Sequence, residues 1–304
     1  MKLLIVDSSF LIYKSFFAFK SNQLKVERDG EVINTSAIFG FIREIIHMKT
    51  GEKYDFIISV YDSPPYLKKQ LSETYKDRPS KKITIPSFND EKILIQAILY
   101  DLNIPCVYKK GYEGEEIAKS LINMHKDEHE IDFYTNDEDC YSLIDENVNL
   151  IKTDKGETIK FGLEDLKAKY NVTPKQFIQM KALTGCKSDN VQGITGVGPV
   201  TASKLVNEFK TIKNIKKNID KIKQEKLKTN IRAAMESGTL TLSKKLTKIE
   251  APRRLKLYKP EEELSYKEIL EYIDAQSFLK GSNKLILANL KKTQRKNNES
   301  IKIN

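Results

Sequence analysis

Acidic side chains follow four buried strands that the sequence predicts, each at or just after the point where the strand ends. They are Asp7, Asp62, the run Glu113-Gly114-Glu115-Glu116, and Asp137 with Asp139. Clustered carboxylates repel one another unless cations lie between them, and oxygen ligands select hard divalent ions such as Mg²⁺ or Mn²⁺. Two such ions about 4 Å apart can hold a phosphodiester, activate a water and stabilise the leaving oxygen. The pattern therefore indicates two-metal phosphoryl chemistry.

Each of these acidic residues also has a simpler interpretation, as a helix cap or a turn residue. Agreement among four strand ends favours a shared site instead. The chain lacks the motifs of other catalytic mechanisms. It has three histidines but no HExxH pair, no Gly-x-Ser-x-Gly elbow and no Gly-Lys-Ser/Thr phosphate loop. Nucleophilic serine or cysteine chemistry is therefore not expected.

The elements that must position the carboxylates alternate between strand and helix. This alternation predicts an α/β fold with a mostly parallel central sheet and crossover helices. Ligands bind such sheets at the carboxyl ends of the strands, where all four acidic groups would gather. The expected strands are 2–6, 55–62, 104–108 and 131–135, and the expected helices are 36–48, 89–102 and the segment that begins near Gly114.

The remaining chain divides into three further parts. Residues 64–88 are basic and lack a core-forming pattern, so we expect an excursion from an α/β core that spans 1–170. Residues 171–280 are expected to be helical. Residues 281–304 are lysine-rich and are expected to form a disordered basic tail.

A glycine-rich turn, Gly196-Val197-Gly198-Pro199, leads directly into a helix-forming segment. Such a turn presents unpaired backbone N–H groups and the positive end of the helix dipole, which together suit a phosphate. The alternative is an ordinary turn between two helices.

Charge is distributed unevenly along the 304 residues. Residues 1–150 carry 19 Lys and Arg against 25 Asp and Glu, whereas residues 151–304 carry 33 against 17. A basic half can neutralise a polyanion, and nucleic acid is the obvious candidate. Lysines that merely solvate helices could account for much of the total charge but explain the asymmetry less well. Three widely spaced cysteines and an apolar start without a signal peptide favour free thiols in the cytoplasm.

Five motifs in this order resemble the 5′-nuclease family, which includes flap endonucleases, phage 5′-exonucleases and the 5′-nuclease domains of bacterial DNA polymerase I. They are LLIVDSSFLIYKSFFAF, VYDSPP with ETYKDRP, GYEGEEIA, TNDEDCYSLI and ALTGCKSDNVQGITGVGPVTASKLV. The resemblance covers roughly residues 3–250 and implies a PIN-like core with a helix-hairpin-helix at 184–209. It implies metal-dependent hydrolysis of DNA phosphodiesters near junctions of single and double strands, in replication or repair.

The resemblance also implies roles for individual residues. Lys76 and Arg78, in a helical arch at 64–88, would contact the scissile phosphate, and Tyr13 and Tyr75 could stack on a splayed base. The implied metal ligands are Asp7, Asp62, Glu113, Glu115, Glu116, Asp137, Asp139 and Asp189. The implied duplex contacts, often with a monovalent cation such as K⁺ at the hairpin, are Gly193, Gly196, Gly198, Thr201 and Lys204.

Three departures from the family pattern bear on catalysis. Cys186 stands where the family usually has an aspartate, and Glu115 and Glu116 stand where it usually has two aspartates. The second metal site is therefore expected to be weakened, which leaves Mn²⁺ open as a better ion than Mg²⁺. The chief alternative is a flap-DNA-binding protein of the same fold with little or no cleavage. An α/β nucleotide-binding or RNA-cleaving protein is a third interpretation.

The implied substrates are DNA with a 5′ flap, a nick or a 5′ end, and an RNA/DNA hybrid stays open as a further one. The sequence leaves open whether the tail recruits a polymerase or a single-strand-binding protein. The chain is expected to act as a monomer.

Overall fold

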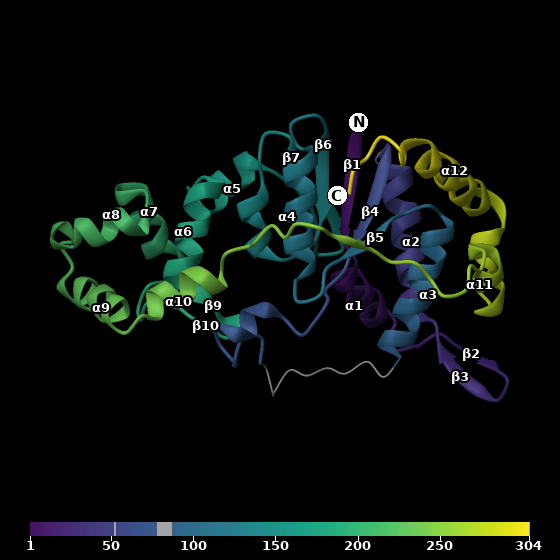
Figure 1. Ribbon diagram of the computed structural model, residues 1–304, viewed down its shortest axis with the longest axis horizontal. Coiled ribbons are helices and arrows are strands. Elements are labelled where there is room, and N and C mark those ends of the chain that lie inside the picture. Colours follow the sequence, from purple (N-terminus) through teal and green to yellow (C-terminus); the bar gives the residue numbers. More distant parts are fainter. Residues whose placement is uncertain (52, 78–86, 304) are drawn as a thin grey trace. The chain divides into compact units, whose positions relative to one another are not determined.

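The computed structural model describes residues 1–51, 53–77 and 87–303 of the chain (Figure 1). Its internal contacts divide the chain into two compact units. Unit 1 comprises Met1–Pro64, Ile83–Asn136 and Ala251–Asn304, and unit 2 comprises Pro65–Lys82 and Asp137–Glu250. Within the described residues, no helix is both long and apolar enough to cross a bilayer.

Unit 1 is built on parallel strands that form where the sequence has continuous apolar runs. The strand order is β11-β5-β4-β1-β6, with β11 antiparallel to β5 at the edge and the other neighbours parallel. The mostly parallel sheet expected from the alternation is thereby confirmed. The bounds are β1 (Lys2–Asp7), β4 (Phe56–Val60), β5 (Cys106–Tyr108), β6 (Glu130–Tyr134) and β11 (Lys256–Leu257).

The order of the strands creates a switch point between β1 and β6. From β1 the chain moves outward to β4 and then β5, and from β5 it returns past both to pair β6 with β1. Right-handed crossovers therefore place α4 on the face of the sheet opposite α1 to α3. The carboxyl ends of β1 and β6 flank the switch point, which is where such sheets bind ligands. The helices are α1 (Ser8–Ala18), α2 (Ser36–Gly51), α3 (Phe88–Asp101) and α4 (Gly114–His125) (Figure 1).

Two features of unit 1 were not expected from the sequence. A two-stranded hairpin, β2 (Lys25–Arg28) and β3 (Glu31–Asn34), follows α1. Within the part 171–280, expected to be helical, the chain breaks between α11 (Tyr266–Tyr272) and the short η6 (Gln276–Leu279).

The expectation of a disordered tail at 281–304 is wrong. Residues Gly281–Asn297 form helix α12, on which Leu287 and Leu290 are fully buried. The Gln294 Oε1 atom accepts a hydrogen bond from the Ile57 N–H at 3.3 Å, which ties α12 to strand β4. Lysines cover the outer face of the helix, so composition concealed a narrow apolar stripe that packs on unit 1.

Unit 2 is mainly helical and contains one antiparallel hairpin of five or more residues per strand, formed by β7 and β8, within its described residues. Its elements are η1 (Leu67–Gln70), η3 (Glu138–Leu143), β7 (Val148–Asp154), β8 (Glu157–Phe161), α5 (Leu163–Tyr170), α6 (Pro174–Thr184), β9 (Gly185–Cys186), η4 (Lys187–Asp189), β10 (Val191–Gln192), α7 (Pro199–Phe209), α8 (Ile212–Lys217), η5 (Ile219–Lys221), α9 (Glu225–Glu236) and α10 (Thr239–Leu246). Thr173 caps α6 by accepting a hydrogen bond from the Gln176 N–H, as its position before Pro174 predicts.

The short hairpin of β9 and β10 depends on two glycines. A Cβ atom on Gly193 would lie 2.2 Å from the Thr184 carbonyl oxygen, and Gly185 adopts a φ of +70°. Only glycine allows the backbones of 184–185 and 193 to approach so closely. The hairpin therefore holds Cys186 and Asp189 on a tightly fixed backbone.

Replacing Leu290 with alanine should lower the free energy of unfolding by about 2–5 kcal/mol, because the leucine is fully buried on α12. Leu285→Ala on the same helix is the matched control, since Leu285 is 66% exposed and its loss should change stability by less than about 0.5 kcal/mol. Urea unfolding of both variants checks this. Equal, small effects would mean that α12 does not contribute to the core.

Candidate metal centre and nucleic-acid interface

Asp7 and Asp62 converge on the first residue of α4. A Cβ atom built on Gly114 would lie 3.6 Å from the Asp7 Oδ1 atom and 3.5 Å from the Asp62 Oδ1 atom. The Gly114 N–H donates a hydrogen bond to Asp62 Oδ1 at 2.6 Å. Asp7 also accepts from the Phe10 N–H at 3.1 Å and from the Thr135 hydroxyl at 3.1 Å, across the switch point between β1 and β6. The structure thus brings two of the predicted carboxylates, Asp7 and Asp62, together at the start of α4.

The glutamates at the start of α4 serve partly as a helix cap. Glu113 and Glu116 are each 2% exposed, and Glu116 Oε2 accepts a hydrogen bond from the Glu113 N–H at 3.1 Å. This is half of a capping box, for which glutamate at the third helical position is well suited. Glu115 is half-buried in the first turn, where the helix dipole favours a negative charge. One oxygen of Glu116 is therefore already used by the local fold.

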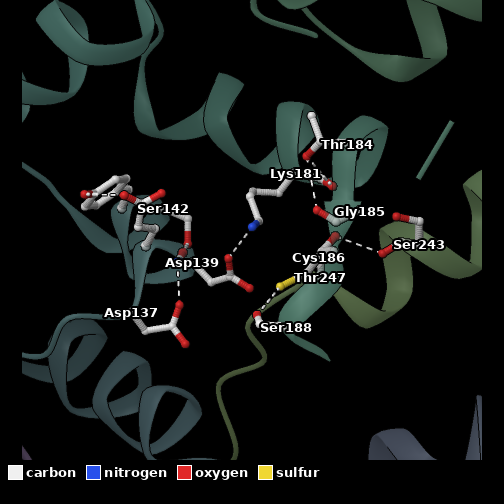
Figure 2. A network of polar contacts seen from close by, with 12 residues as sticks. Asp137, Asp139, Ser142, Lys181, Thr184, Gly185, Cys186, Ser188, Ser243 and Thr247 are labelled. Carbon is white, nitrogen blue, oxygen red and sulfur yellow. Dashed lines mark hydrogen bonds and ion pairs between the residues drawn. The ribbon is translucent and has the colours of Figure 1, made fainter. Parts of the chain in front are cut away.

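Unit 2 holds a second group, formed by Asp139, Cys186 and Asp189. One ligand atom from each of these three buried residues lies within 4.8 Å of the others. Figure 2 shows the side chains of Asp139 and Cys186 facing one another from η3 and the β9 hairpin. Two carboxylates and a thiol at this spacing could hold one divalent ion.

Lys181 of α6 forms an ion pair with Asp139, with 2.5 Å between Nζ and Oδ1 (Figure 2). Although burial lowers the pKa of Lys181, the charge of Asp139 raises it above its ordinary value. Its ammonium therefore neutralises part of the acidic group. Sequence reasoning missed Lys181, and the available signal was a lysine on the helix that leads directly into Gly185-Cys186.

The nearby acidic groups shift the pKa of Asp137. Although Asp137 is exposed to solvent, desolvation by the surrounding protein atoms and then the charge of Asp139 raise the pKa of its carboxyl to about 6, even though its side chain accepts a hydrogen bond from the Asp139 N–H at 2.9 Å. The charge of Lys76 acts in the opposite direction. Crowded carboxylates of this kind fit a divalent cation, because a cation would relieve the repulsion that raises this pKa.

Cys186 is a neutral thiol at pH 7. Burial, followed by the charges of Asp139 and Asp189, raises its pKa to about 11, and its Sγ atom lies 2.9 Å from the Ser188 hydroxyl oxygen (Figure 2). The thiol also belongs to an apolar cluster with Tyr75, Val191 and Leu246. It therefore adds packing where the family usually has a charged ligand.

Glu138 anchors the loop that carries Asp137 and Asp139, a role the sequence did not reveal. Its two carboxylate oxygens accept hydrogen bonds from Lys169 Nζ at 2.5 Å and from the Tyr170 hydroxyl at 2.9 Å. Both partners lie at the end of α5. The loop is thus fixed by its middle residue.

The aromatic and basic residues implied to contact DNA differ in accessibility. Tyr13 is 40% exposed and stacks on Phe88 with 4.7 Å between ring centroids, so its outer face is open to a base. Tyr75 is only 1% exposed, so the prediction that it stacks on a splayed base does not fit this structure. Lys76 is half-buried, and Arg78 lies outside the described residues.

The glycine turn in unit 2 opens a helix as predicted. Gly196 has a φ of +77°, and Gly198 is the N-cap of α7. Buried Ile194 and Val197 anchor the turn, whereas Lys204 is exposed on α7. The residues 184, 187 and 190–199 line a hollow of about 840 Å³. Backbone N–H groups beside a hollow of this kind suit a phosphate.

Two family models match adjacent parts of the chain. The model described as 5′-3′ exonuclease, N-terminal resolvase-like domain matches residues 2–171, and the model described as 5′-3′ exonuclease, C-terminal SAM fold matches residues 172–271. The chain belongs to the 5′-3′ exonuclease family. The resemblance stated from the motifs is thereby confirmed.

The relatives that this chain matches include long DNA polymerases and a shorter exonuclease. DNA polymerase I of Caldicellulosiruptor bescii is 32% identical over 267 residues, which cover 84% of this chain and 30% of that protein. The 5′-3′ exonuclease of Aquifex aeolicus is 29% identical over 288 residues, which cover 90% of this chain and 95% of that protein. The chain therefore spans about a third of the polymerases but nearly all of the shorter exonuclease.

Solved structures share the fold. The 5′-exonuclease of phage T5 with bound zinc is 18% identical with a TM-score of 0.64, covering 97% of this chain and 99% of that chain. The catalytic core of Rad2 in complex with DNA substrate is 18% identical with a TM-score of 0.59, covering 95% and 92%.

The raised pKa of Asp137 predicts competition between protons and metal. A divalent ion needs the ionised carboxylate, so apparent affinity should fall as pH drops through about 6, by about tenfold one unit below that value. Calorimetric titration with Mn²⁺ on both sides of this pH checks it. Glu157→Gln, at an exposed position of β8, should keep the same pH dependence, whereas pH-independent affinity in the wild type would contradict the assignment.

Cys186→Asp should make the protein more dependent on metal for its stability. Without metal the melting temperature should fall, because a third carboxylate is placed beside Asp139 and Asp189 in an apolar cluster. With Mg²⁺ or Mn²⁺ the rise in melting temperature should exceed that of the wild type, because an oxygen ligand is restored. Cys186→Asn is the uncharged control of matched size. Equal metal responses in both variants would mean that position 186 does not face the ion.

Proposed function

We propose that the chain is a divalent-metal-dependent 5′-3′ exonuclease and flap endonuclease. The observation that carries the proposal is the gathering of carboxylates at the strand ends of unit 1 and around Asp139 in unit 2, in a chain that belongs to the 5′-3′ exonuclease family. Metal-bound relatives of the same fold, such as the zinc-bound T5 exonuclease, support a metal requirement.

The proposed ligands follow from the two groups. The first group supplies Asp7, Asp62 and Glu113, and the second supplies Asp137, Asp139 and Asp189. When bound, divalent ions would lower the pKa of an attacking water and neutralise charge on the phosphate. The chain itself contributes the ammonium of Lys76 as a fixed positive charge near Asp137, suited to a phosphate that gains negative charge.

Duplex DNA is proposed to rest on the glycine turn of unit 2. The turn presents backbone N–H groups and the N-terminus of α7, which bind phosphates without reading sequence. Thr201 and exposed Lys204 lie in the first two turns of α7 and extend the same surface. The Rad2 core, which shares the fold, is in complex with a DNA substrate.

The finer assignments are also proposals. Mg²⁺ is the proposed ion, with Mn²⁺ as an alternative that tolerates the thiol better. We also propose that K⁺ binds at the glycine turn and that the protein acts as a monomer. A cytoplasmic location is proposed because all three cysteines are free and buried. Replication or repair is the proposed setting, with a polymerase or single-strand-binding protein as a partner.

Cleavage of a 5′-flap substrate tests the proposal. Wild-type protein with Mg²⁺ or Mn²⁺ should release the flap, whereas Asp62→Ala and Asp137→Asn should lower kcat by at least about 100-fold. Glu157→Gln is the matched control for loss of a carboxylate at an exposed position. Unchanged cleavage by both active-site variants would contradict the proposed nuclease function.

A flap-binding protein without turnover is the second candidate. The specific observation in its favour is that Cys186 is a buried neutral thiol and that Glu116 is engaged in a helix cap. Tight flap binding with no product in either metal would select it.

DNA affinity should fall steeply with salt, because phosphate contacts release counterions. Lys204→Ala should reduce the slope of log affinity against log salt by about one, since an exposed lysine on α7 would neutralise one phosphate. Fluorescence anisotropy over a salt series measures both slopes. Lys155→Ala, in the turn between β7 and β8, serves as an exposed control; an identical effect of the two variants would argue against a DNA contact at α7.

A further inference from the structure

Two segments of unit 2 that are distant in sequence, 74–76 and 186–190, are joined by direct contacts. The Lys76 N–H donates a hydrogen bond to the Asp189 carbonyl oxygen at 2.9 Å. The Asn190 side-chain amide donates to the Thr74 carbonyl oxygen at 3.0 Å. Thr74, Tyr75 and Lys76 are thus held along the hairpin that carries Cys186 and Asp189.

Tyr75 lies in the chain between Thr74 and Lys76, the two residues that make these hydrogen bonds. Its ring is 1% exposed and packs with Cys186, Val191 and Leu246. The ammonium of buried Lys68 lies 5.6 Å from the ring centroid, a cation–π arrangement that holds the ring further. A ring in this position anchors the backbone and does not present a face to a nucleobase.

The residue that follows the anchor has an unusual backbone. Lys76 has a φ of +55°, a left-handed conformation that residues with a side chain seldom adopt. Such a conformation persists when the surroundings determine it, here through Tyr75 on one side and the Asp189 carbonyl on the other. It turns the Lys76 side chain toward Tyr66, with 5.2 Å between Nζ and the ring centroid, and within electrostatic range of Asp137.

We propose that Tyr75 is a positioning residue for Lys76. Burial of its ring among Cys186, Val191 and Leu246 fixes the Lys76 backbone against Asp189, and this fixes where the ammonium meets the scissile phosphate. The inference rests on the proposed function of Lys76. It also gives the thiol at position 186 a role, because a neutral, compact side chain there completes the seat of the ring.

Steady-state kinetics on the flap substrate test the positioning. Lys76→Ala and Tyr75→Ala should each lower kcat, on the order of 100-fold for the loss of a preorganised charge, with little change in KM, and the double variant should lose no more than Lys76→Ala alone. Tyr75→Phe keeps the packing and should keep kcat. Leu246→Ala, which removes a buried part of the seat, should lower kcat in the same way.

Leu240→Ala is the matched control, because Leu240 is buried on the same helix α10 but lies outside the cluster around Tyr75. It should reduce stability and leave kcat unchanged. If Tyr75→Ala instead raises KM while Leu246→Ala behaves like Leu240→Ala, the ring contacts DNA and the proposal is overturned.

Hydrogen exchange of the Lys76 amide measures how firmly Tyr75 fixes the Lys76 backbone, independently of cleavage activity. The amide should be protected in the wild type and in Tyr75→Phe, and should exchange at least about tenfold faster in Tyr75→Ala. An equally protected amide in Tyr75→Ala would overturn the positioning while leaving the proposed nuclease function standing. Unchanged kcat in Lys76→Ala would overturn both the positioning and the catalytic role of Lys76.

Discussion

Mutual repulsion among closely spaced carboxylates is the constraint on which the proposed site depends. In unit 2, Asp139 and Asp189 are buried, Asp137 is exposed beside them, and desolvation together with the charges of both raises the pKa of the Asp137 carboxyl. The fold opposes this repulsion with the Lys181 ammonium on Asp139 and with the clamp of Lys169 and Tyr170 on Glu138. The acidic group is therefore assembled by the protein itself and is poised to gain free energy from a divalent ion.

In unit 1, hydrogen bonds from backbone N–H groups stabilise the negative charge of the carboxylates. Asp7 caps α1, Asp62 accepts the first N–H of α4, and Glu116 accepts the Glu113 N–H. The interpretation of these acids as helix caps and their interpretation as metal ligands are thus compatible, because a carboxylate has oxygens for both. Caps fix the orientation of each side chain before any ion binds, which lowers the entropy cost of assembling a metal site.

The sequence was sufficient where local pattern and chemistry agree. The apolar run that ends on Asp7 predicted both strand β1 and the position of the terminal carboxylate at the carboxyl end of that strand. It was insufficient where contacts are distant in sequence: the burial of Tyr75 depends on Leu246, and the ion pair of Asp139 depends on the packing of α6. Helix α12 was missed because its buried stripe is narrow and its lysines dominate the composition. Arg78 lies outside the described residues, together with residues 79–86 of the expected arch, so the expected role of Arg78 stays a prediction.

Thermal unfolding of wild type and Asp137→Asn, each with and without Mn²⁺, tests the central claim most directly. If repulsion strains the metal-free site, the neutral asparagine should raise the melting temperature without metal, because it removes one negative charge beside Asp139 and Asp189 while its amide oxygen can still accept the Asp139 N–H. The same variant should lose most of the stabilisation that Mn²⁺ gives the wild type. A variant that is less stable without metal, yet gains as much from Mn²⁺ as the wild type, would contradict the account.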